Sequence, residues 1–247
     1  GTINNLTENS FINSMTGGTI KKMDADASNG GGKIASMTGG LIEDFTSGLI
    51  DNMAGSGASN AAAIDVMNGG TITTMGEYAH INTMNDGTIT NMGDTEYYRD
   101  SSIGTMTGGI IENMLYNSKI DSMTGGTIKH MDNISEIGVL DGGTINFVDG
   151  NITIGQFDSG KIGTMQNGIV TLMNSGGIDE LRGVANVATM NGGRVGFMDG
   201  AATKNDLNSG TIDKMTGGTR IYTMNSGTVK AMAQGATINN LRGGTVN

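Results

Sequence analysis

The chain contains no cysteine, no proline and no tryptophan, and only five phenylalanines and five tyrosines among its 247 residues. The lack of cysteine excludes a disulfide framework and a thiolate metal site. High glycine without proline argues against a collagen-like or disordered chain, because both usually contain proline. No apolar run approaches the roughly 18 residues that a membrane helix needs, so the sequence predicts no membrane insertion.

Basic residues are also scarce. The chain has 14 lysines and arginines against 24 acidic residues, which gives a formal net charge of −10. Proteins that bind along the phosphate backbone of a nucleic acid have more basic than acidic residues. We therefore expect no nucleic-acid partner. We expect the negative charge to keep the glycine-rich surface soluble.

What the chain does contain is a short repeat, with 43 glycines and 19 methionines spread along its length. The unit reads T-I-x-x-M-x-G-G, and clear copies of its T-I-x-x-M part are residues 19–23, 71–75, 88–92, 127–131 and 211–215. Ile or Val occupies the first core position, and Met, Leu, Phe or Val occupies the second. Lys204 is the one polar exception at a first core position, although Leu207 still follows three residues later.

The spacing of the first core positions sets the size of the structural repeat. Most are alternately 8 and 9 residues apart. Two units together, about 17 residues, therefore form one coil, and the alternative is a coil of three units with about 25 residues. The alternation sorts the positions into one row with Ile103, Ile120, Ile137 and Ile154, and another with Ile111, Ile128, Ile145 and Ile162. The phase of the alternation is lost near Ile50.

The alternative to strands is a helix, because Ile and Met three residues apart also suit one helical face. Repeated glycines would cost such a helix about 1 kcal/mol each, whereas β-branched residues favour strands and glycine favours turns. Residues i and i+3 point to opposite faces of a straight strand, so burial of both requires a bend at or just after the pair. The sequence predicts an all-β fold, one continuous parallel β-solenoid over residues 1–247 with a core of stacked Ile and Met.

Three spacings of 14 residues interrupt the pattern and predict loop insertions at 24–32, 54–63 and 93–102. Loops on a regular scaffold commonly hold binding residues. The chain also starts and ends within a repeat without a polar cap, from which we expect a piece of a longer protein or ends that meet other subunits.

The predicted contact residues are Tyr97, Tyr98 and Arg99, which form the densest aromatic spot and lie in the third insertion. Aromatic and arginine clusters anchor recognition of sugars and proteins. The alternative is that these side chains pack onto the solenoid.

A calcium loop is the nearest match to a metal site. Asp24, Asp26 and Ser28 follow its spacing, but the positions that require Gly and Glu hold Asn29 and Ala35. We therefore expect a solvated polar loop, with no metal and no cofactor.

No pattern predicts an enzyme. The two histidines, His80 and His130, stand at positions that face solvent. The acidic residues are scattered, and we expect no acidic pair, Asp179 and Glu180 included, to have a basic residue beside it. The sites of glycan-cleaving solenoids instead cluster acidic and basic residues on one face.

Threonine often precedes the first core position, as at Thr71 and Thr88, and flat outward threonine ladders are typical of ice-binding solenoids. A second threonine follows two residues later at Thr73 and Thr90, but Lys, Asn or Asp mostly replaces it. This breaks the regular T-x-T lattice.

The tandem G-G-T-I-x-x-M-x-G-G units resemble the low-complexity β-solenoid repeats of bacterial surface adhesins and phage tail-fibre shafts. The resemblance covers nearly the whole chain and concerns architecture, not one family. It implies a stiff, non-catalytic fibre or shaft segment of an extracellular, cell-surface or virion appendage, with fibre partners or self-association and a cell-surface glycan or receptor as ligand. The alternatives are a self-assembling extracellular filament, with coils stacked end to end, and a solenoid that binds glycan or ice with one flat face.

Overall fold

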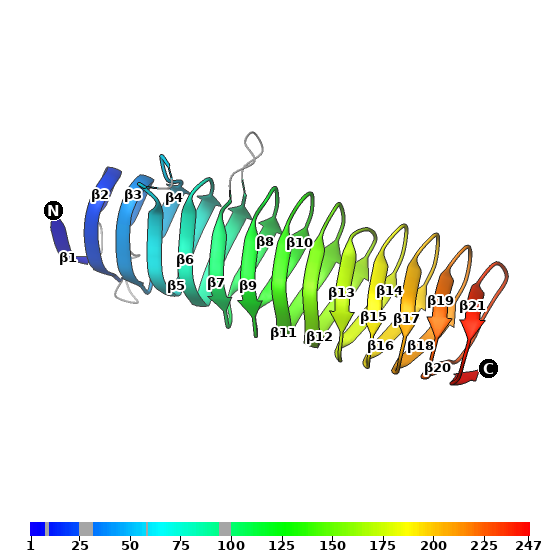
Figure 1. The fold of residues 1–247 in the computed structure, drawn as a ribbon. Coiled ribbons are helices and arrows are strands. Elements are labelled where there is room, and N and C mark those ends of the chain that lie inside the picture. Colours follow the sequence, from blue (N-terminus) through cyan, green and yellow to red (C-terminus); the bar gives the residue numbers. More distant parts are fainter. Residues whose placement is uncertain (8–9, 25–31, 58, 94–99) are drawn as a thin grey trace. The chain divides into compact units, whose positions relative to one another are not determined.

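The computed structural model of the chain describes residues 1–7, 10–24, 32–57, 59–93 and 100–247. These residues form 22 strands and no helix, which confirms the predicted all-β class. The chain divides into two compact units, Gly1–Lys129 (unit 1) and His130–Asn247 (unit 2). Each unit is a parallel β-solenoid, coloured from blue to green and from green to red in Figure 1.

Most strands contain either one repeat unit, in about five residues, or two units joined through a turn, and β20 and β22 have two residues each. Unit 1 contains β1 (Thr2–Leu6), β2 (Phe11–Met23), β3 (Lys33–Phe45), β4 (Leu49–Met53), β5 (Ala62–Met75), β6 (Ala79–Met92), β7 (Ser102–Met106), β8 (Ile110–Met114) and β9 (Lys119–Met123). The boundary between the units falls within β10 (Thr127–Met131). Unit 2 contains β11 (Glu136–Val148), β12 (Thr153–Met165), β13 (Ile169–Met173), β14 (Gly177–Leu181), β15 (Asn186–Met190), β16 (Arg194–Met198), β17 (Thr203–Leu207), β18 (Thr211–Met215), β19 (Arg220–Met224), β20 (Thr228–Val229), β21 (Thr237–Leu241) and β22 (Thr245–Val246).

The strand register joins equivalent positions of successive repeats. In unit 1, Ile64 of β5 pairs with Ile81 of β6, and in unit 2, Ile137 of β11 pairs with Ile154 of β12. Both pairs are 17 residues apart in the chain. Each coil therefore contains two units, which confirms the predicted repeat and excludes the three-unit coil.

Each five-residue segment bends at its third residue. In β9, Ile120 and Met123 are buried and Asp121 is exposed. In the register between β7 and β9, the first, second, fourth and fifth residues of each segment are paired, whereas the third residues are not. A straight strand would direct Ile120 and Met123 to opposite faces, so the bend at Asp121 brings both into the core, as predicted.

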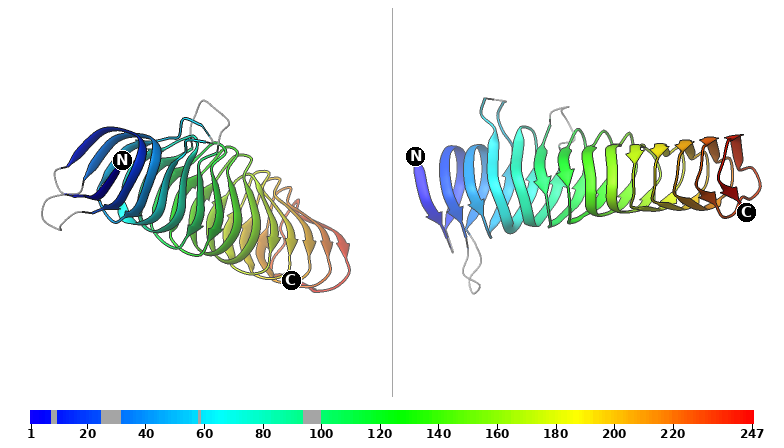
Figure 2. Two further views of the ribbon diagram at one scale, coloured as in Figure 1. Left: turned by 60° about the vertical axis from the view of Figure 1, so that its left-hand side comes forward. Right: turned by 60° about the horizontal axis from the view of Figure 1, so that its bottom comes forward.

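The buried first core residues form two rows in each unit, which we call row A and row B. In unit 1, row A contains Ile20, Ile42, Ile64, Ile81, Ile103 and Ile120, and row B contains Ile34, Ile50, Ile72, Ile89, Ile111 and Ile128. In unit 2, row A contains Ile137, Ile154, Val170, Val187, Lys204 and Ile221, and row B contains Ile145, Ile162, Ile178, Val195, Ile212 and Val229. The strand segments that carry these rows lie on two sides of each stack of coils (Figure 2). Their outward residues are called face A and face B.

The turns between the rows explain the loss of phase near Ile50. A tight turn has three residues and ends in a glycine with positive φ, as at Gly126 (81°), a conformation that only glycine adopts without strain. Between Ile34 and Ile50 both turns are tight, so this coil has 16 residues. In unit 1 the tight turn follows row A from β4 onward, whereas in β2 and β3 it follows row B. In unit 2 a tight turn also follows row B between β12 and β13, so Ile162 and Ile178 are 16 residues apart.

The three predicted insertions lie between strands: 24–32 between β2 and β3, 54–61 between β4 and β5, and 93–101 between β6 and β7. The second and third predicted ranges extend slightly into β5 and β7. The first insertion leaves the stack after row A and the other two leave it after row B. The insertions therefore start from two opposite edges of unit 1.

Candidate interaction surfaces

The predicted contact residues Tyr97, Tyr98 and Arg99 lie outside the described residues, as do Asp26 and Ser28 of the calcium-like segment. Within the described ranges, no group of three or more His, Asp or Glu side chains could hold a metal ion. The same ranges contain no helix of the length and apolar character needed to cross a membrane.

Backbone hydrogen bonds tie the second and third insertions to the stack around Tyr78. The Gly55 N–H donates to the Glu77 carbonyl at 2.6 Å, and the Ala62 N–H donates to the Tyr78 carbonyl at 3.2 Å. The Tyr78 N–H in turn donates to the Asp100 carbonyl at 3.1 Å. Tyr78 has a φ of 51°, which is uncommon for an aromatic residue. This edge of unit 1 is therefore an irregular surface on an otherwise regular stack.

Face B of unit 2 carries ion pairs on its acidic residues. Lys161 Nζ lies 2.7 Å from Asp179 Oδ2, and Arg182 Nε lies 2.9 Å from Glu180 Oε2. The expectation that this acidic pair lacks a basic neighbour is therefore wrong. Lys161 and Asp179 are one coil apart, so their proximity depends on the register. Exposed pairs of this kind contribute at most about 1 kcal/mol each.

Asp213 joins three coils on the same face. Arg194 Nε, from the preceding coil, donates to Asp213 Oδ2 at 2.7 Å, and Lys230 Nζ, from the following coil, lies 2.9 Å from Oδ1. The hydrogen bonds from Lys230 and Arg194 lower the pKa of Asp213, against a smaller opposing effect of burial. This carboxylate is held ionised as a bridge between coils.

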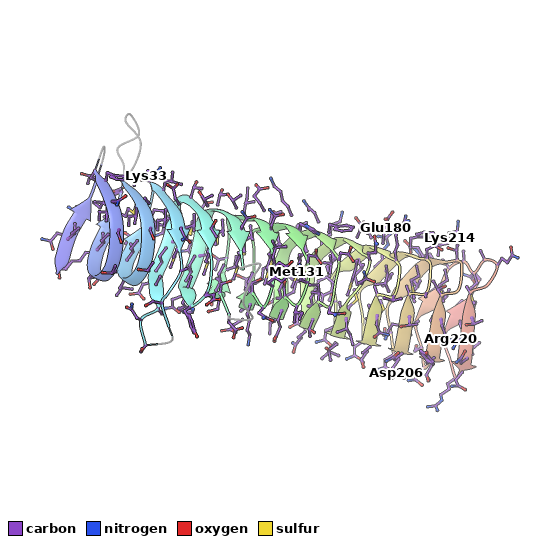
Figure 3. The ribbon with its side chains drawn as sticks, turned by 90° about the horizontal axis from the view of Figure 1, so that it is seen from above. Lys33, Met131, Glu180, Asp206, Lys214 and Arg220 are labelled. Atoms are coloured by element: carbon purple, nitrogen blue, oxygen red, sulfur yellow. The ribbon has the colours of Figure 1, made fainter. Side chains whose placement is uncertain are left out.

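A phenylalanine lies between two cations on face B. The Arg182 guanidinium lies 5.5 Å and the Lys214 ammonium 5.8 Å from the centre of the Phe197 ring. Figure 3 shows Glu180 and Lys214 on one side of unit 2, with Asp206 and Arg220 of face A on the opposite side. Face B of unit 2 is thus dense in charges that are paired with one another.

Face A of unit 2 differs because three successive coils present no charged side chain. The outward residues of the first segment of β12, of β13 and of β15 are Thr153, Gly155, Gln156, Ile169, Thr171, Leu172, Asn186, Ala188 and Thr189. These side chains are small, polar or apolar and stand on parallel strands about 4.8 Å apart. The result is an uncharged surface on a protein of strongly negative charge.

A polar ladder that the sequence analysis did not identify follows the tight turns of unit 2. Asn225 donates to Asn208, Asn208 to Asn191, and Asn191 to Asn174, with N···O distances of 2.8, 3.0 and 3.1 Å. Asn174 donates to Asp158 at 2.8 Å. The signal in the sequence is a polar residue after the second core position, recurring at the length of one coil.

The threonine columns on face B of unit 1 are short. The register places Thr71 beside Thr88, but the next coil places Ile110 beside Thr88. The T-x-T pattern therefore extends over two coils, in agreement with the interruption seen in the sequence.

Each histidine contacts a side chain of a neighbouring coil. His80 Nδ1 lies 2.9 Å from Ser102 Oγ in unit 1, and the ring of His130 lies 5.4 Å from that of Phe147 in unit 2. Both histidines are half-buried on the outer surface. These contacts orient the rings between coils.

The comparisons with known proteins give no match. No family model, no curated protein and no solved structure matches the chain.

Proposed function

We propose that this chain is a structural shaft segment of an extracellular, cell-surface or virion appendage and that it has no catalytic role. The observation that supports the proposal is the repetition of one register in both units. In unit 1 Ile pairs with Ile and Met mostly with Met from coil to coil, and in unit 2 Ile or Val fills the same positions except at Lys204. A shaft requires such repetition, because each added coil must stack on the last in the same register.

The repeated register has a mechanical consequence. Hydrogen bonds between coils run along the stacking direction, and the apolar rows form a core that continues from one coil to the next. Ion pairs and asparagine bonds cross the same coil boundaries on the surface. Bending a unit would break several of these contacts at once, so we expect each unit to be stiff.

Electron microscopy of the purified chain tests the shaft. We expect discrete rods, and insertion of four further copies of residues 211–227 after Gly227 should lengthen them by about 19 Å. A scrambled insertion of equal length is the control and should not lengthen the rod. Fibres of micrometre length would instead support the self-assembling filament, and compact particles would contradict both.

The location is tested separately with antibodies against the purified chain. Immunogold labelling of intact cells and particles from the source should mark projecting appendages. Labelling confined to the cell interior would contradict an extracellular or virion role.

The uncharged face A of unit 2 favours one second candidate, a surface that binds neutral glycan. Sedimentation with insoluble neutral polysaccharides tests it, because Thr171→Arg and Ala188→Arg place charge on this face. These variants should release the protein if face A binds. Thr164→Arg on face B is the matched control. Thermal hysteresis above that of a control protein would instead indicate ice binding.

A further inference from the structure

Lys204 occupies a position in the core that an apolar residue fills in the neighbouring coils. It pairs with Val187 of β15 on one side and with Ile221 of β19 on the other, and its side chain is fully buried. The other members of row A and row B in unit 2 are Ile or Val. Lys204 is thus the one ionisable member of the two rows.

The amine has two backbone partners. Lys204 Nζ donates to the Val187 carbonyl at 2.9 Å and to the Ala188 carbonyl at 2.7 Å. Both carbonyls belong to the preceding coil, and Ala188 is the third residue of β15, where the chain bends. The bonds partly compensate for the loss of water around the ammonium group, but they leave a cation inside an apolar core.

Few charged groups surround this amine. On its own strand, the carboxylate of Asp206 favours the protonated form, while burial opposes it more strongly and lowers the pKa of Lys204 to about 7. The segment of β15 that faces it has no titratable residue, and Arg220 and Tyr222 of β19 are on face A. Across the core, β16 and β18 bury only Val195, Met198, Ile212 and Met215, while their charged residues are less buried.

We infer that Lys204 makes the β17 coil a weak point of unit 2 that is controlled by a proton. Opening of this coil returns the amine to water, where the ammonium form is favoured. The coil therefore opens most readily when Lys204 is protonated and becomes more stable as the pH rises. A fall in pH from 9 to 7 would loosen the stack at one defined coil.

The sign follows from proton linkage. A lysine whose pKa is lowered in the closed coil binds more protons in the open coil, between pH 7 and its ordinary pKa of 10.5. Over this range the opening equilibrium should fall by up to about tenfold per pH unit. Below pH 7 both states are protonated and the dependence ends.

Amide hydrogen exchange of the full chain, corrected for intrinsic rates, measures this opening. We expect protection of β17 to rise between pH 7 and 9. Lys204→Ile restores the residue type of the row, so it should protect β17 at pH 7 and remove its pH dependence. Lys214→Ile is the matched control on the exposed face of β18 and should leave the dependence in place. Asp206→Asn should move the onset to lower pH.

Two results would overturn the inference. One is protection of β17 that stays constant from pH 7 to 9 in the unaltered chain, and the other is the same dependence in Lys204→Ile. Lys204→Met provides a second apolar replacement with a similar flexible stem. Failure of both variants to fold would also refute the inference, because it requires that an apolar residue fits this position.

Discussion

The terminal methyl of Met84 occupies the space that a side chain on Gly109 would need, since a Cβ on Gly109 would lie 2.6 Å from Met84 Cε. The same relationship recurs in unit 2, where a Cβ on Gly210 would lie 2.7 Å from Met190 Cε. The second core residue of one coil thus packs against the tight turn of the next. The glycine that ends such a turn and the methionine of the preceding coil are therefore required together.

Substitution of Gly109 should be strongly destabilising. Its φ is 80°, and an added Cβ would also lie 2.8 Å from the Gly87 carbonyl oxygen, which cannot move as freely as a methionine side chain. Backbone strain and overpacking together predict that Gly109→Ala lowers the free energy of unfolding by about 2–4 kcal/mol, measured by chemical denaturation.

The matched control is Gly177→Ala, because a Cβ on Gly177 would meet no atom within 4 Å. This change should stay within about 0.5 kcal/mol of the unaltered chain. Equal effects at Gly109 and Gly177 would show that the packing of methionine on the turn is unimportant.

Two serines at equivalent buried positions should respond in opposite directions to removal of the hydroxyl. Ser118 Oγ is buried without a hydrogen-bond partner, whereas Ser135 Oγ donates to the Asp132 carbonyl at 2.6 Å. Ala79 fills the corresponding position of another coil. We expect Ser118→Ala to stabilise and Ser135→Ala to destabilise the fold, each by about 1 kcal/mol, in thermal unfolding. A shift of the same sign in both would refute this interpretation.

The asparagine ladder should be more sensitive in its interior than at its end. Asn191 donates one side-chain bond and accepts another, whereas Asn225 only donates. Each bond contributes about 0.5–1.5 kcal/mol, so Asn191→Ala should cost roughly twice as much as Asn225→Ala in urea denaturation. If the two costs are the same, the amides act independently of the ladder.

Asp213 should contribute to acid unfolding. Because its pKa is lowered in the folded state, it stabilises the fold above its ordinary value of 3.8, and this contribution is lost as the pH falls through the folded value. Asp213→Asn should therefore lower stability near neutral pH and weaken the dependence below about pH 4. Melting temperatures from pH 7 to 2 measure the effect. Asp65→Asn, at an exposed position of β5, is the control that should retain the full dependence.

Much of the fold was predictable because each coil repeats the side chains of its neighbours. Contacts between Ile64 and Ile81, or between Ile137 and Ile154, join residues that are distant along the chain, but they appear in the sequence as a fixed period. The strand type, the two-unit coil, the bend between core residues and the approximate places of the insertions all follow from that period. The contact residues Tyr97, Tyr98 and Arg99 remain a prediction.

The sequence by itself determined which side chains enter the core, since period and residue type alone distinguish Ile and Met from the polar positions around them. Only the tertiary structure decided which surface groups meet, because the pairing of Lys161 with Asp179 depends on the length of the intervening coil. It also decided the state of Lys204. A lysine in an apolar row is visible in the sequence, but whether its amine finds acceptors depends on the direction of the carbonyls at the bend of the preceding coil.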